Sequence, residues 1–344
     1  MRKILALAEG RFSPLKSKTA NGALSYLNGE VVAIVDSTKA GSTAQDVLGY
    51  GGSVPVVATI DEGMAFGPDS LLIGIAPPGG RLPDEWRQWI LAALRHGLNI
   101  LSGLHTILSE DAEFSLAAEE CGCTITDWRK IPLEYEVVSK GNWRRRTAKT
   151  ILTVGSDCNI GKMTTMLEVY KEFLARGHSS DFIGTGQTGI MISGKGIAVD
   201  AIISDYIAGS IEKAIDESAA GGHQYIFVEG QGALTHQGYS GVTYGLMHGT
   251  MPDAMILCHQ PTRLKDDYGT TIPELNRLIR LHEEVVGIFK PTKIVGIGIN
   301  SIGLSDDESR RETATIEDAT GLPAVDAFRF GGTKLADALV RYLH

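Results

Sequence analysis

A glycine-containing loop at residues 155–165, GSDCNIGKMTT, constrains the fold of this chain more than any other segment. The loop follows an apolar run, ILTV, that is typical of a buried strand, and it precedes a stretch with helical spacing at residues 162–176. In such a strand–loop–helix unit, main-chain N–H groups surround an anion and the helix N-terminus adds partial positive charge. Lys162 adds a formal charge. The sequence therefore predicts an α/β domain that binds a phosphorylated ligand.

The spacing within this loop departs from the usual phosphate-loop pattern at two points. Five residues rather than four separate Gly155 from Gly161, and Met163 stands where a Ser or Thr normally follows the lysine. That hydroxyl normally holds Mg²⁺ beside a triphosphate, and a thioether is a poor ligand for this ion. A pyrophosphate that only anchors its ligand, as in coenzyme A, needs no metal there, although Thr164 or Thr165 could supply the hydroxyl for ATP with Mg²⁺. The residues expected to contact the ligand are Gly155, Ser156, Asp157, Cys158, Asn159, Ile160, Gly161, Lys162, Met163, Thr164 and Thr165.

Short apolar runs alternate with helix-like stretches, which predicts two α/β units with parallel sheets. In the first half, strands are expected at residues 3–8, 31–36, 54–58, 71–76, 99–102 and 124–126, and a helix at 84–95. In the second half, strands are expected at 150–154, 182–185, 225–228, 254–258 and 293–299, and helices at 162–176, 207–219 and 272–282. The alternation of apolar runs and helix-like stretches is interrupted between these halves. We therefore predict an N-terminal domain at 1–130, a linker at 131–148 and a C-terminal domain at 149–344.

Composition excludes several classes of partner. The chain has 32 Lys and Arg against 41 Asp and Glu, and its net charge of −9 opposes long-range attraction to nucleic acid or an anionic membrane. Its apolar runs are far shorter than the ~20 residues that a membrane span needs. Glu9 and Arg11 interrupt any secretory core near the start, and the four cysteines form no paired zinc pattern or disulfide framework. We expect a cytoplasmic protein with reduced thiols, no resident metal and no nucleic-acid or membrane partner.

The longer phosphate loop resembles that of the dethiobiotin synthetase group of P-loop enzymes. Two later features resemble the same group: EGQG at residues 229–232 ends a strand, and GIN at 298–300 places Asn300 where the group has an asparagine against adenine. This resemblance implies a kinase or carboxylate-activating ligase that uses ATP and Mg²⁺, with Glu229 and Asp205 holding the metal. Turn residues are the structural alternative for Glu229 and Asn300.

A second resemblance extends over nearly the whole chain, to the D-glutamate N-acetyltransferase-like family. The segments that carry it are GSDCNIGKMTTMLEVYKE (155–172), GTGQTGIMISGKG (184–196), VDAIISDYIAGSIEKAI (199–215), VEGQGALTHQGYSG (228–241), CHQPTR (258–263) and, in the first half, IAPPGG (75–80), SGLHTIL (102–108) and TDWRK (126–130). The resemblance implies a Rossmann-like N-terminal domain followed by a P-loop NTPase-like domain. It also implies transfer of an acetyl group from acetyl-CoA to the amine of D-glutamate or a related amino acid.

Amide formation from a thioester needs a proton acceptor for the amine and hydrogen-bond donors for the developing oxyanion. His236 and Glu229 are the candidate bases, and His236 is preferred because an imidazole titrates near neutral pH. Asp205 could orient the amine. The alternatives are a hydrogen bond within its own loop for His236 and a helix-terminal position for Asp205. Cys158 lies near Lys162 and a helix start, so we expect a lowered thiol pKa and a less favoured role as a covalent acyl carrier.

A dicarboxylate amino acid requires a cation, and a guanidinium suits a carboxylate because it donates two parallel hydrogen bonds. Arg263, which follows the strand at 254–258, is the first candidate, and Arg329 is the second. For both, a surface position is the alternative. Further substrate contacts are expected from uncharged polar residues that follow neighbouring strands, namely Gln187, Thr188 and Gln231.

The first domain gives weaker functional signals. Its first strand leads into EGRFSPLKSKTANG rather than G-x-G-x-x-G, so dinucleotide binding is poorly supported despite Asp36 at the end of the second strand. We expect this domain to form a wall of the substrate site or an oligomer surface, in a homo-oligomer that acts on a small molecule. The leading hypothesis is an N-acetyltransferase; an ATP-dependent ligase or kinase is the second, and a non-catalytic nucleotide sensor is the third.

Overall fold

The computed structural model describes residues 2–75 and 80–344. Residues 76–79, which include the end of the strand expected at 71–76 and most of the IAPPGG segment, lie outside this description. The chain forms two compact units, one of Met1–Ile131 with Ile190–Gly194 and one of Pro132–Gly189 with Lys195–His344. Within the described residues, no helix has both the length and the apolar character needed to cross a membrane.

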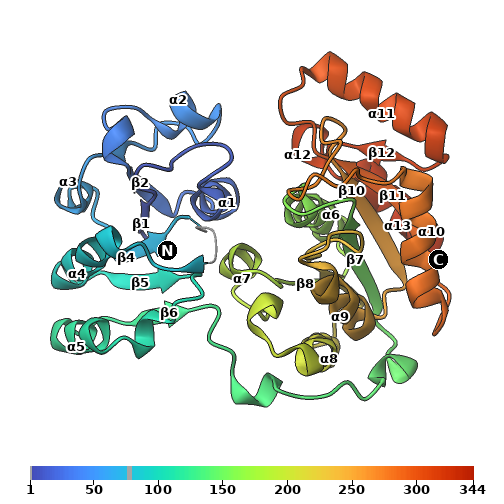
Figure 1. Ribbon diagram of the computed structural model, residues 1–344, viewed down its shortest axis with the longest axis horizontal. Coiled ribbons are helices and arrows are strands. Elements are labelled where there is room, and N and C mark those ends of the chain that lie inside the picture. The colour runs from blue at the N-terminus through green and yellow to red at the C-terminus, as the bar shows by residue number, and fades with distance from the viewer. Residues whose placement is uncertain (1, 76–79) are drawn as a thin grey trace. The chain divides into compact units, whose positions relative to one another are not determined.

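The first unit contains a parallel sheet with the strand order β3-β2-β1-β4-β5-β6 (Figure 1). This order is that of the Rossmann fold. The strands are β1 (Ile4–Leu7), β2 (Val31–Val35), β3 (Val56–Val57), β4 (Ser70–Ile73), β5 (Asn99–Ser102) and β6 (Ile125–Asp127). Every residue of β1 and β4 is buried, as expected for a sheet that helices cover on both faces.

The crossover helices of the first unit are α1 (Lys18–Tyr26), α2 (Ala44–Leu48), α3 (Ile60–Met64), α4 (Arg87–Arg95) and α5 (Ala112–Cys121). Right-handed crossovers place α1 and α2 on one face of the sheet and the other three on the opposite face, where α4 contacts both α3 and α5. Asp111 caps the start of α5, and Gly122 ends it in the left-handed conformation. The helix expected at 84–95 is confirmed, but its first turn is a 3-10 helix that follows Pro83.

The second unit contains another parallel sheet, with the order β12-β11-β10-β7-β9-β8. Its strands are β7 (Lys149–Gly155), β8 (Ser180–Ile183), β9 (Tyr225–Val228), β10 (Ala254–His259), β11 (Lys293–Ile299) and β12 (Ala324–Val325). The chain proceeds from β7 outward to β8, returns to β9, and then crosses to β10 on the other side of β7. The strand order therefore reverses at β7, which is where open α/β sheets collect ligands.

Helices cover both faces of this second sheet. They are α6 (Lys162–Ala175), α7 (Gln187–Ser193), α8 (Ile207–Ala220), α9 (Ser240–Thr250), α10 (Leu275–Gly287), α11 (Asp306–Thr320), α12 (Ala327–Phe330) and α13 (Thr333–Leu343). Helix α6 contacts α12 and α13 on one face, and α8 contacts α9 on the other. Phe173 anchors α6 on the sheet through edge-on contacts with Tyr225 and Phe227.

The α/β fold and its two parallel sheets are confirmed, and so is each strand expected in the second half. Two expectations about helices need correction. The helix expected at 272–282 begins at Leu275, because Pro273 precedes it, and continues to Gly287. No helix was expected directly after β8, but Gln187 begins helix α7 there.

Candidate functional site

The carboxyl ends of β7, β9 and β10 lead into the three loops that form the candidate site. These strands are neighbours in the sheet and run parallel, so the loops that follow them meet at one edge. The loop after β7 is the predicted phosphate loop, the loop after β9 carries His236, and the loop after β10 carries Arg263.

Two glycines determine the shape of the phosphate loop. Gly161 has a φ angle of 96°, in the left-handed region, directly before α6 begins at Lys162. A Cβ atom on Gly155 would lie 3.0 Å from Lys162 Nζ and 3.1 Å from the carbonyl oxygen of Asp157. Asn300 lies beside the same turn: a Cβ atom on Gly161 would be 3.6 Å from the Cβ of Asn300. The loop thus gathers Asn300 and Lys162 around a turn that favours glycine at 161 and leaves little room for a side chain at 155.

The side chain of Lys162 is buried within this loop. Its ammonium group donates a hydrogen bond of 2.7 Å to the carbonyl oxygen of Asp157, and its aliphatic stem passes against Gly230. A buried ammonium needs hydrogen-bond acceptors or an anion, and the loop supplies an acceptor at a position where a phosphate oxygen could take its place.

Arg263 binds residues in the first half of the phosphate loop. Its Nε lies 2.6 Å from the buried carboxylate of Asp157, and its Nη1 donates a 3.3 Å hydrogen bond to the carbonyl oxygen of Cys158. Its Nη2 lies 2.7 Å from Asp267. Much of the hydrogen-bonding capacity of this guanidinium is therefore used within the protein, so the predicted role of Arg263 in substrate binding has to compete with these contacts.

One sequence expectation about the loop is wrong. Burial raises the pKa of the Cys158 thiol, whereas its proximity to Lys162 was expected to lower it. The attraction of Lys162 does act in the expected direction, but desolvation outweighs it. A neutral thiol is a poor nucleophile, so this environment disfavours Cys158 as an acyl carrier.

The hydroxyl groups that could replace the missing Mg²⁺ ligand are differently placed. Met163 is buried in the first turn of α6. Thr165 is also buried and turns toward the sheet, where it forms a hydrogen bond with Cys258 and lies against Gly298. Thr164 is half-buried. The Thr165 hydroxyl therefore faces the sheet and not the phosphate loop.

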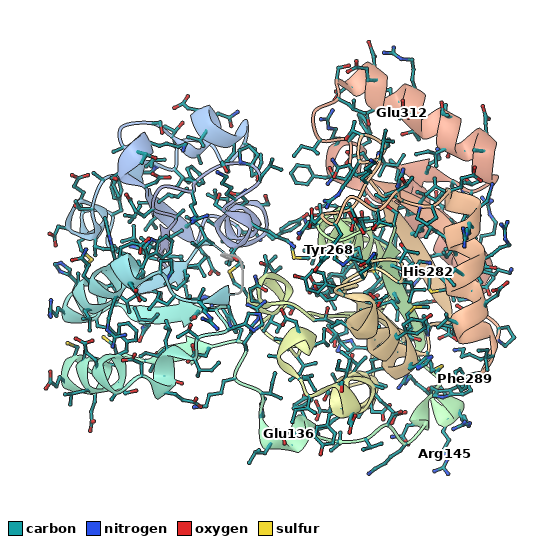
Figure 2. The ribbon with its side chains drawn as sticks, viewed as in Figure 1. Glu136, Arg145, Tyr268, His282, Phe289 and Glu312 are labelled. Carbon is teal, nitrogen blue, oxygen red and sulfur yellow. The ribbon has the colours of Figure 1, made fainter. Side chains whose placement is uncertain are left out.

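His236 is almost completely buried, with 1% of its surface exposed, and lies beside the phosphate loop. Its Nδ1 accepts a 3.2 Å hydrogen bond from the N–H group of Gly238. The ring stacks on Tyr239 with 4.8 Å between centroids, and Tyr268 meets it edge-on at 5.3 Å (Figure 2 labels Tyr268). In the neutral ring, an accepting Nδ1 leaves the proton on Nε2. Within the described residues, that Nε2 is buried and has no hydrogen-bond partner.

A small cavity of about 50 Å³ connects this histidine with the loop. It is lined by Ser156, Asp157 and His236, and by residues of the segment that follows β10, including Asp266 and Pro273. His236 and the phosphate loop, which the sequence analysis proposed separately, are thus brought to one place.

Ligating atoms of Asp157, Cys158 and His236 lie within 4.8 Å of one another, which is the spacing of a metal site. Their present bonding does not suit a cation. The Asp157 carboxylate already pairs with Arg263, and the Nδ1 of His236 accepts a backbone N–H, so the Nε2 carries the proton that a metal would have to displace. The arrangement instead favours an acceptor or an anion opposite the Nε2–H group.

The carboxylate of Glu229 serves the backbone of a neighbouring loop. Its Oε2 accepts hydrogen bonds of 2.8 and 3.1 Å from the N–H groups of Thr185 and Gly186, directly before α7. The side chain of Gln231 lies against the same Gly186. Glu229 thus has the structural role of fixing the turn after β8.

The other predicted residues lie at three places. Gln187 and Thr188 are buried in the first turn of α7. Asp205 is exposed in a 3-10 turn, Ser204–Tyr206, outside the phosphate loop. Arg329 pairs with Asp306 at 3.1 Å and is not part of the lining of the 50 Å³ cavity.

His259 was missed by the sequence analysis. It ends β10, and its Nδ1 lies 2.9 Å from Ser156 Oγ, in a pair that joins two segments of the site. Burial lowers the pKa of His259 to about 4, so the ring is neutral at pH 7. The available signal was its position: a histidine at the carboxyl end of a strand in the sheet that carries the loop.

Fold and site together define a two-unit α/β protein with a Rossmann-like sheet and a P-loop sheet. Two family models match the chain: "Domain of unknown function (DUF1611_N) Rossmann-like domain" at residues 37–131 and "Domain of unknown function (DUF1611_C) P-loop domain" at residues 137–336. The chain belongs to the DUF1611 family.

Three relatives extend this assignment. A protein of Tritonibacter scottomollicae named D-glutamate N-acetyltransferase is 40% identical over 82% of this chain and 84% of its own length. A protein of the same name from a Pseudoalteromonas species is 33% identical over 79% of this chain and 82% of its own. The crystal structure of a DUF1611 family protein from Anabaena variabilis is 33% identical, has a TM-score of 0.94, and covers 99% of this chain and 100% of its own.

Proposed function

We propose that this protein transfers the acetyl group of acetyl-CoA to the amine of D-glutamate or a related amino acid. The names of the two relatives support the reaction class. The observation that carries the choice of ligand is the phosphate loop itself. It offers Lys162 and glycine-shaped backbone, but Met163 stands in the place of the metal-binding hydroxyl and Thr165 is turned into the sheet. Such a loop suits the metal-free pyrophosphate of CoA better than a triphosphate bound to Mg²⁺.

The reaction joins the amine nitrogen to the thioester carbonyl carbon and then breaks the carbon–sulfur bond. The carbonyl oxygen becomes negative in the intermediate, so a preorganised donor stabilises it. The Nε2–H group of His236 is such a donor, because Nδ1 is occupied by Gly238 and Nε2 has no partner among the described residues. We therefore assign His236 to the oxyanion or the departing thiolate, in place of the role of base expected from the sequence.

The amine has to lose a proton during the reaction. After attack the nitrogen carries a positive charge and is strongly acidic, so a carboxylate is a sufficient acceptor. Asp266 lines the same cavity as His236 and is the acceptor that we assign. Both carboxylates accept backbone hydrogen bonds, Glu229 from Thr185 and Gly186 and Asp266 from Tyr268 and Thr270. Glu229 is less suited because it does not line the cavity that contains His236.

The second candidate is an ATP-dependent kinase or ligase of the dethiobiotin synthetase type. The length of the phosphate loop favours it, because the five residues between Gly155 and Gly161 resemble the loop of that group. Asn300 lies beside Gly161. In this alternative Asn300 contacts adenine, a contact that the adenine of CoA could equally make.

One assay separates the two functions. The purified protein is incubated with acetyl-CoA and D-glutamate in EDTA without ATP, and free thiol and N-acetylglutamate are measured. We expect both products in equal amounts, with D-glutamate omitted as a control. The ligase or kinase would instead be established by two results together: ADP forms from ATP only when D-glutamate is present, and no thiol is released when ATP is absent.

A further inference from the structure

We propose that Arg277 binds the side-chain carboxylate of the amino-acid acceptor, in a cavity between α10 and the loop that carries His236. This inference rests on the proposed function for the identity of the acceptor. The binding of a dicarboxylate can nevertheless be measured without any reaction, so the two proposals can fail separately.

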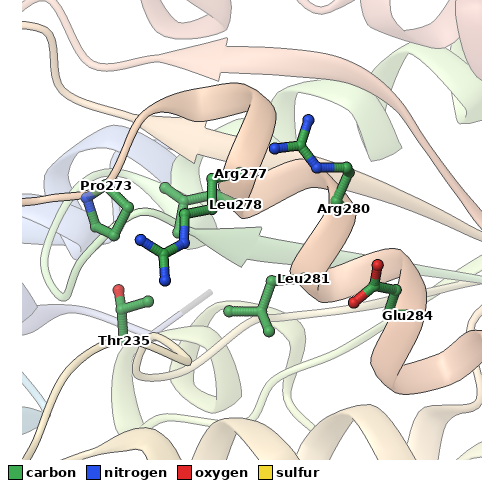
Figure 3. A pocket seen from close by; sticks show the side chains of 7 residues that line it. All are labelled: Thr235, Pro273, Arg277, Leu278, Arg280, Leu281 and Glu284. Carbon is green, nitrogen blue, oxygen red and sulfur yellow. The ribbon is translucent and has the colours of Figure 1, made fainter.

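The cavity has a volume of about 470 Å³ and lies along α10 (Figure 3). It is lined by Thr235 and Pro273 and, from the helix, by Arg277, Leu278, Arg280, Leu281 and Glu284. This cavity is therefore large and partly apolar. Two arginines against one glutamate give its lining a net positive charge, which suits an acidic ligand with an aliphatic chain.

The large cavity adjoins the site of the proposed reaction. Thr235 and Pro273 also line the 50 Å³ cavity that reaches Ser156, Asp157 and His236. A molecule that occupied the larger cavity could thus place one end beside the imidazole and the other against α10. D-Glutamate has this form, because its amine and its side-chain carboxylate are at opposite ends of a short aliphatic chain.

The position of Arg277 favours the binding of a negatively charged group beside its guanidinium. Helix α10 connects β10 to the parallel strand β11, so its first turn lies at the carboxyl edge of the sheet, where the phosphate loop also lies. Arg277 is in that first turn, where the partial positive charge of the helix N-terminus disfavours a cation. Within residues 2–75 and 80–344 its guanidinium forms no ion pair, whereas that of Arg263 pairs with two carboxylates. A bound carboxylate would compensate both positive charges.

Two arginines line the cavity, and their directions differ. In Figure 3 the guanidinium of Arg277 points toward Thr235, whereas that of Arg280, one turn further along α10, points away from it. A carboxylate between Arg277 and Thr235 would receive the paired N–H groups of the arginine and the hydroxyl of the threonine. Leu278 and Leu281 would contact the methylene groups. Arg280 is therefore the matched control, with the same charge on the same helix.

The first experiment measures binding by calorimetry in the presence of CoA. Glutarate and D-glutamate are the dicarboxylate probes, and D-norvaline, which has a methyl group in place of the carboxylate, is the neutral probe. We expect Arg277→Gln to weaken glutarate and D-glutamate at least tenfold and to leave D-norvaline unchanged. Arg280→Gln should change each affinity less than twofold. Equal losses in the two variants would indicate general attraction to a cationic surface and would overturn the inference.

The second experiment measures acetyl transfer. Arg277→Gln should raise the KM for D-glutamate at least tenfold, with little change in the KM for acetyl-CoA, and Arg277→Lys should recover part of the loss. If wild type transfers acetyl groups and Arg277→Gln keeps the KM for D-glutamate within twofold, the inference is wrong and the proposed function stands. If no transfer occurs but glutarate binding depends on Arg277, the proposed function is wrong and the inference about Arg277 stands.

Discussion

The two sheets of this protein have the same parallel architecture but use their carboxyl edges differently. In the first unit, Asp36 at the end of β2 is buried and accepts hydrogen bonds from the N–H groups of Phe12 (2.8 Å) and Thr38 (3.0 Å). Glu9, after β1, accepts one from the N–H group of Ser37. In the second unit, the buried Nε2 of His236 has no partner among the described residues, and a cavity of about 50 Å³ lies beside the ring.

This difference explains why one fold type can serve two purposes. In dinucleotide-binding Rossmann domains, an acidic residue at the end of the second strand receives the ribose hydroxyls. Here Asp36 holds a loop of its own chain, so the first edge is closed by internal hydrogen bonds. At the second edge, His236 and Arg277 line cavities, and Lys162 is buried in the adjacent phosphate loop. We therefore expect substitutions in the second edge to change catalysis and those in the first edge to change stability alone.

The largest effect is expected for His236→Phe, which keeps a ring of similar size but has no N–H group. Loss of a donor to the oxyanion should lower kcat for acetyl transfer about 100-fold, with little change in the KM for acetyl-CoA. Steady-state kinetics with the thiol assay measure kcat and KM. His223→Phe, in the same unit, is the control and should retain activity. A His236→Phe enzyme with wild-type kcat would contradict the role of His236 in the reaction.

The next effect is expected for Lys162→Ala. Because its ammonium group would contact the pyrophosphate, the variant should bind CoA about 30-fold more weakly, a cost of about 2 kcal/mol. Calorimetric titration with CoA measures the affinity. Lys171→Ala removes a lysine from the exposed side of the same helix and should leave the affinity unchanged. Equal affinities of wild type and Lys162→Ala for CoA would contradict the anchoring role.

A loss of stability within the second edge is expected for Arg263→Ala. The variant leaves the buried carboxylate of Asp157 without its cation, and we expect the free energy of unfolding to fall by about 2 kcal/mol. This is less than for a fully buried pair because the Arg263 side chain is 20% exposed. Urea denaturation measures it. Adding Asp157→Asn to the variant should recover much of the loss, and strictly additive losses would mean that the ion pair contributes nothing.

Asp36→Asn tests the first edge directly. An amide keeps one acceptor but turns an NH₂ group toward a backbone N–H, so we expect a loss of about 1 kcal/mol in the free energy of unfolding. The KM values for acetyl-CoA and D-glutamate should not change. A weakened affinity for CoA in this variant would show that the first edge takes part in ligand binding.

The smallest effect is a pH dependence of stability from His282, which is buried in α10 (labelled in Figure 2). Burial lowers its pKa to about 4, whereas an unfolded histidine titrates near 6.5. As the pH falls below 6.5, the unfolded chain gains a proton that the folded chain does not, so stability is lost. Between pH 7 and pH 6 the wild type should lose less than about 1 kcal/mol from this group. His282→Asn should show a correspondingly smaller loss, and identical slopes would exclude the contribution.

The sequence predicts the parts of this molecule that depend on local pattern. The strands and the phosphate loop follow from short apolar runs and from glycines near Lys162, which act within a few residues of one another. The fate of polar side chains depends on distant partners. Ser156 pairs with His259, 103 residues away, and Arg263 reaches Asp157 across a similar separation. Patterns in the sequence do not show these pairs, so Arg263 appeared to be available and His259 was overlooked.

The cavity along α10 could not be predicted for the same reason. Arg277 belongs to an ordinary amphipathic helix in the sequence, and its exposed face looks like solvated surface. Only the fold brings the first turn of α10 beside Thr235 and the loop of His236. By contrast, ligand binding after β7 could be predicted from the sequence, because the apolar strand, the glycines and Lys162 that indicate it follow one another directly. The strand order of the sheet could not be predicted in this way.

A crystal structure of the complex with CoA tests the central claim most directly. We expect the pyrophosphate of CoA to lie over residues 155–165, bonded to main-chain N–H groups and to the ammonium group of Lys162, with the thiol directed toward His236. CoA bound at the carboxyl edge of the first sheet, with the loop after β7 empty, would contradict the account.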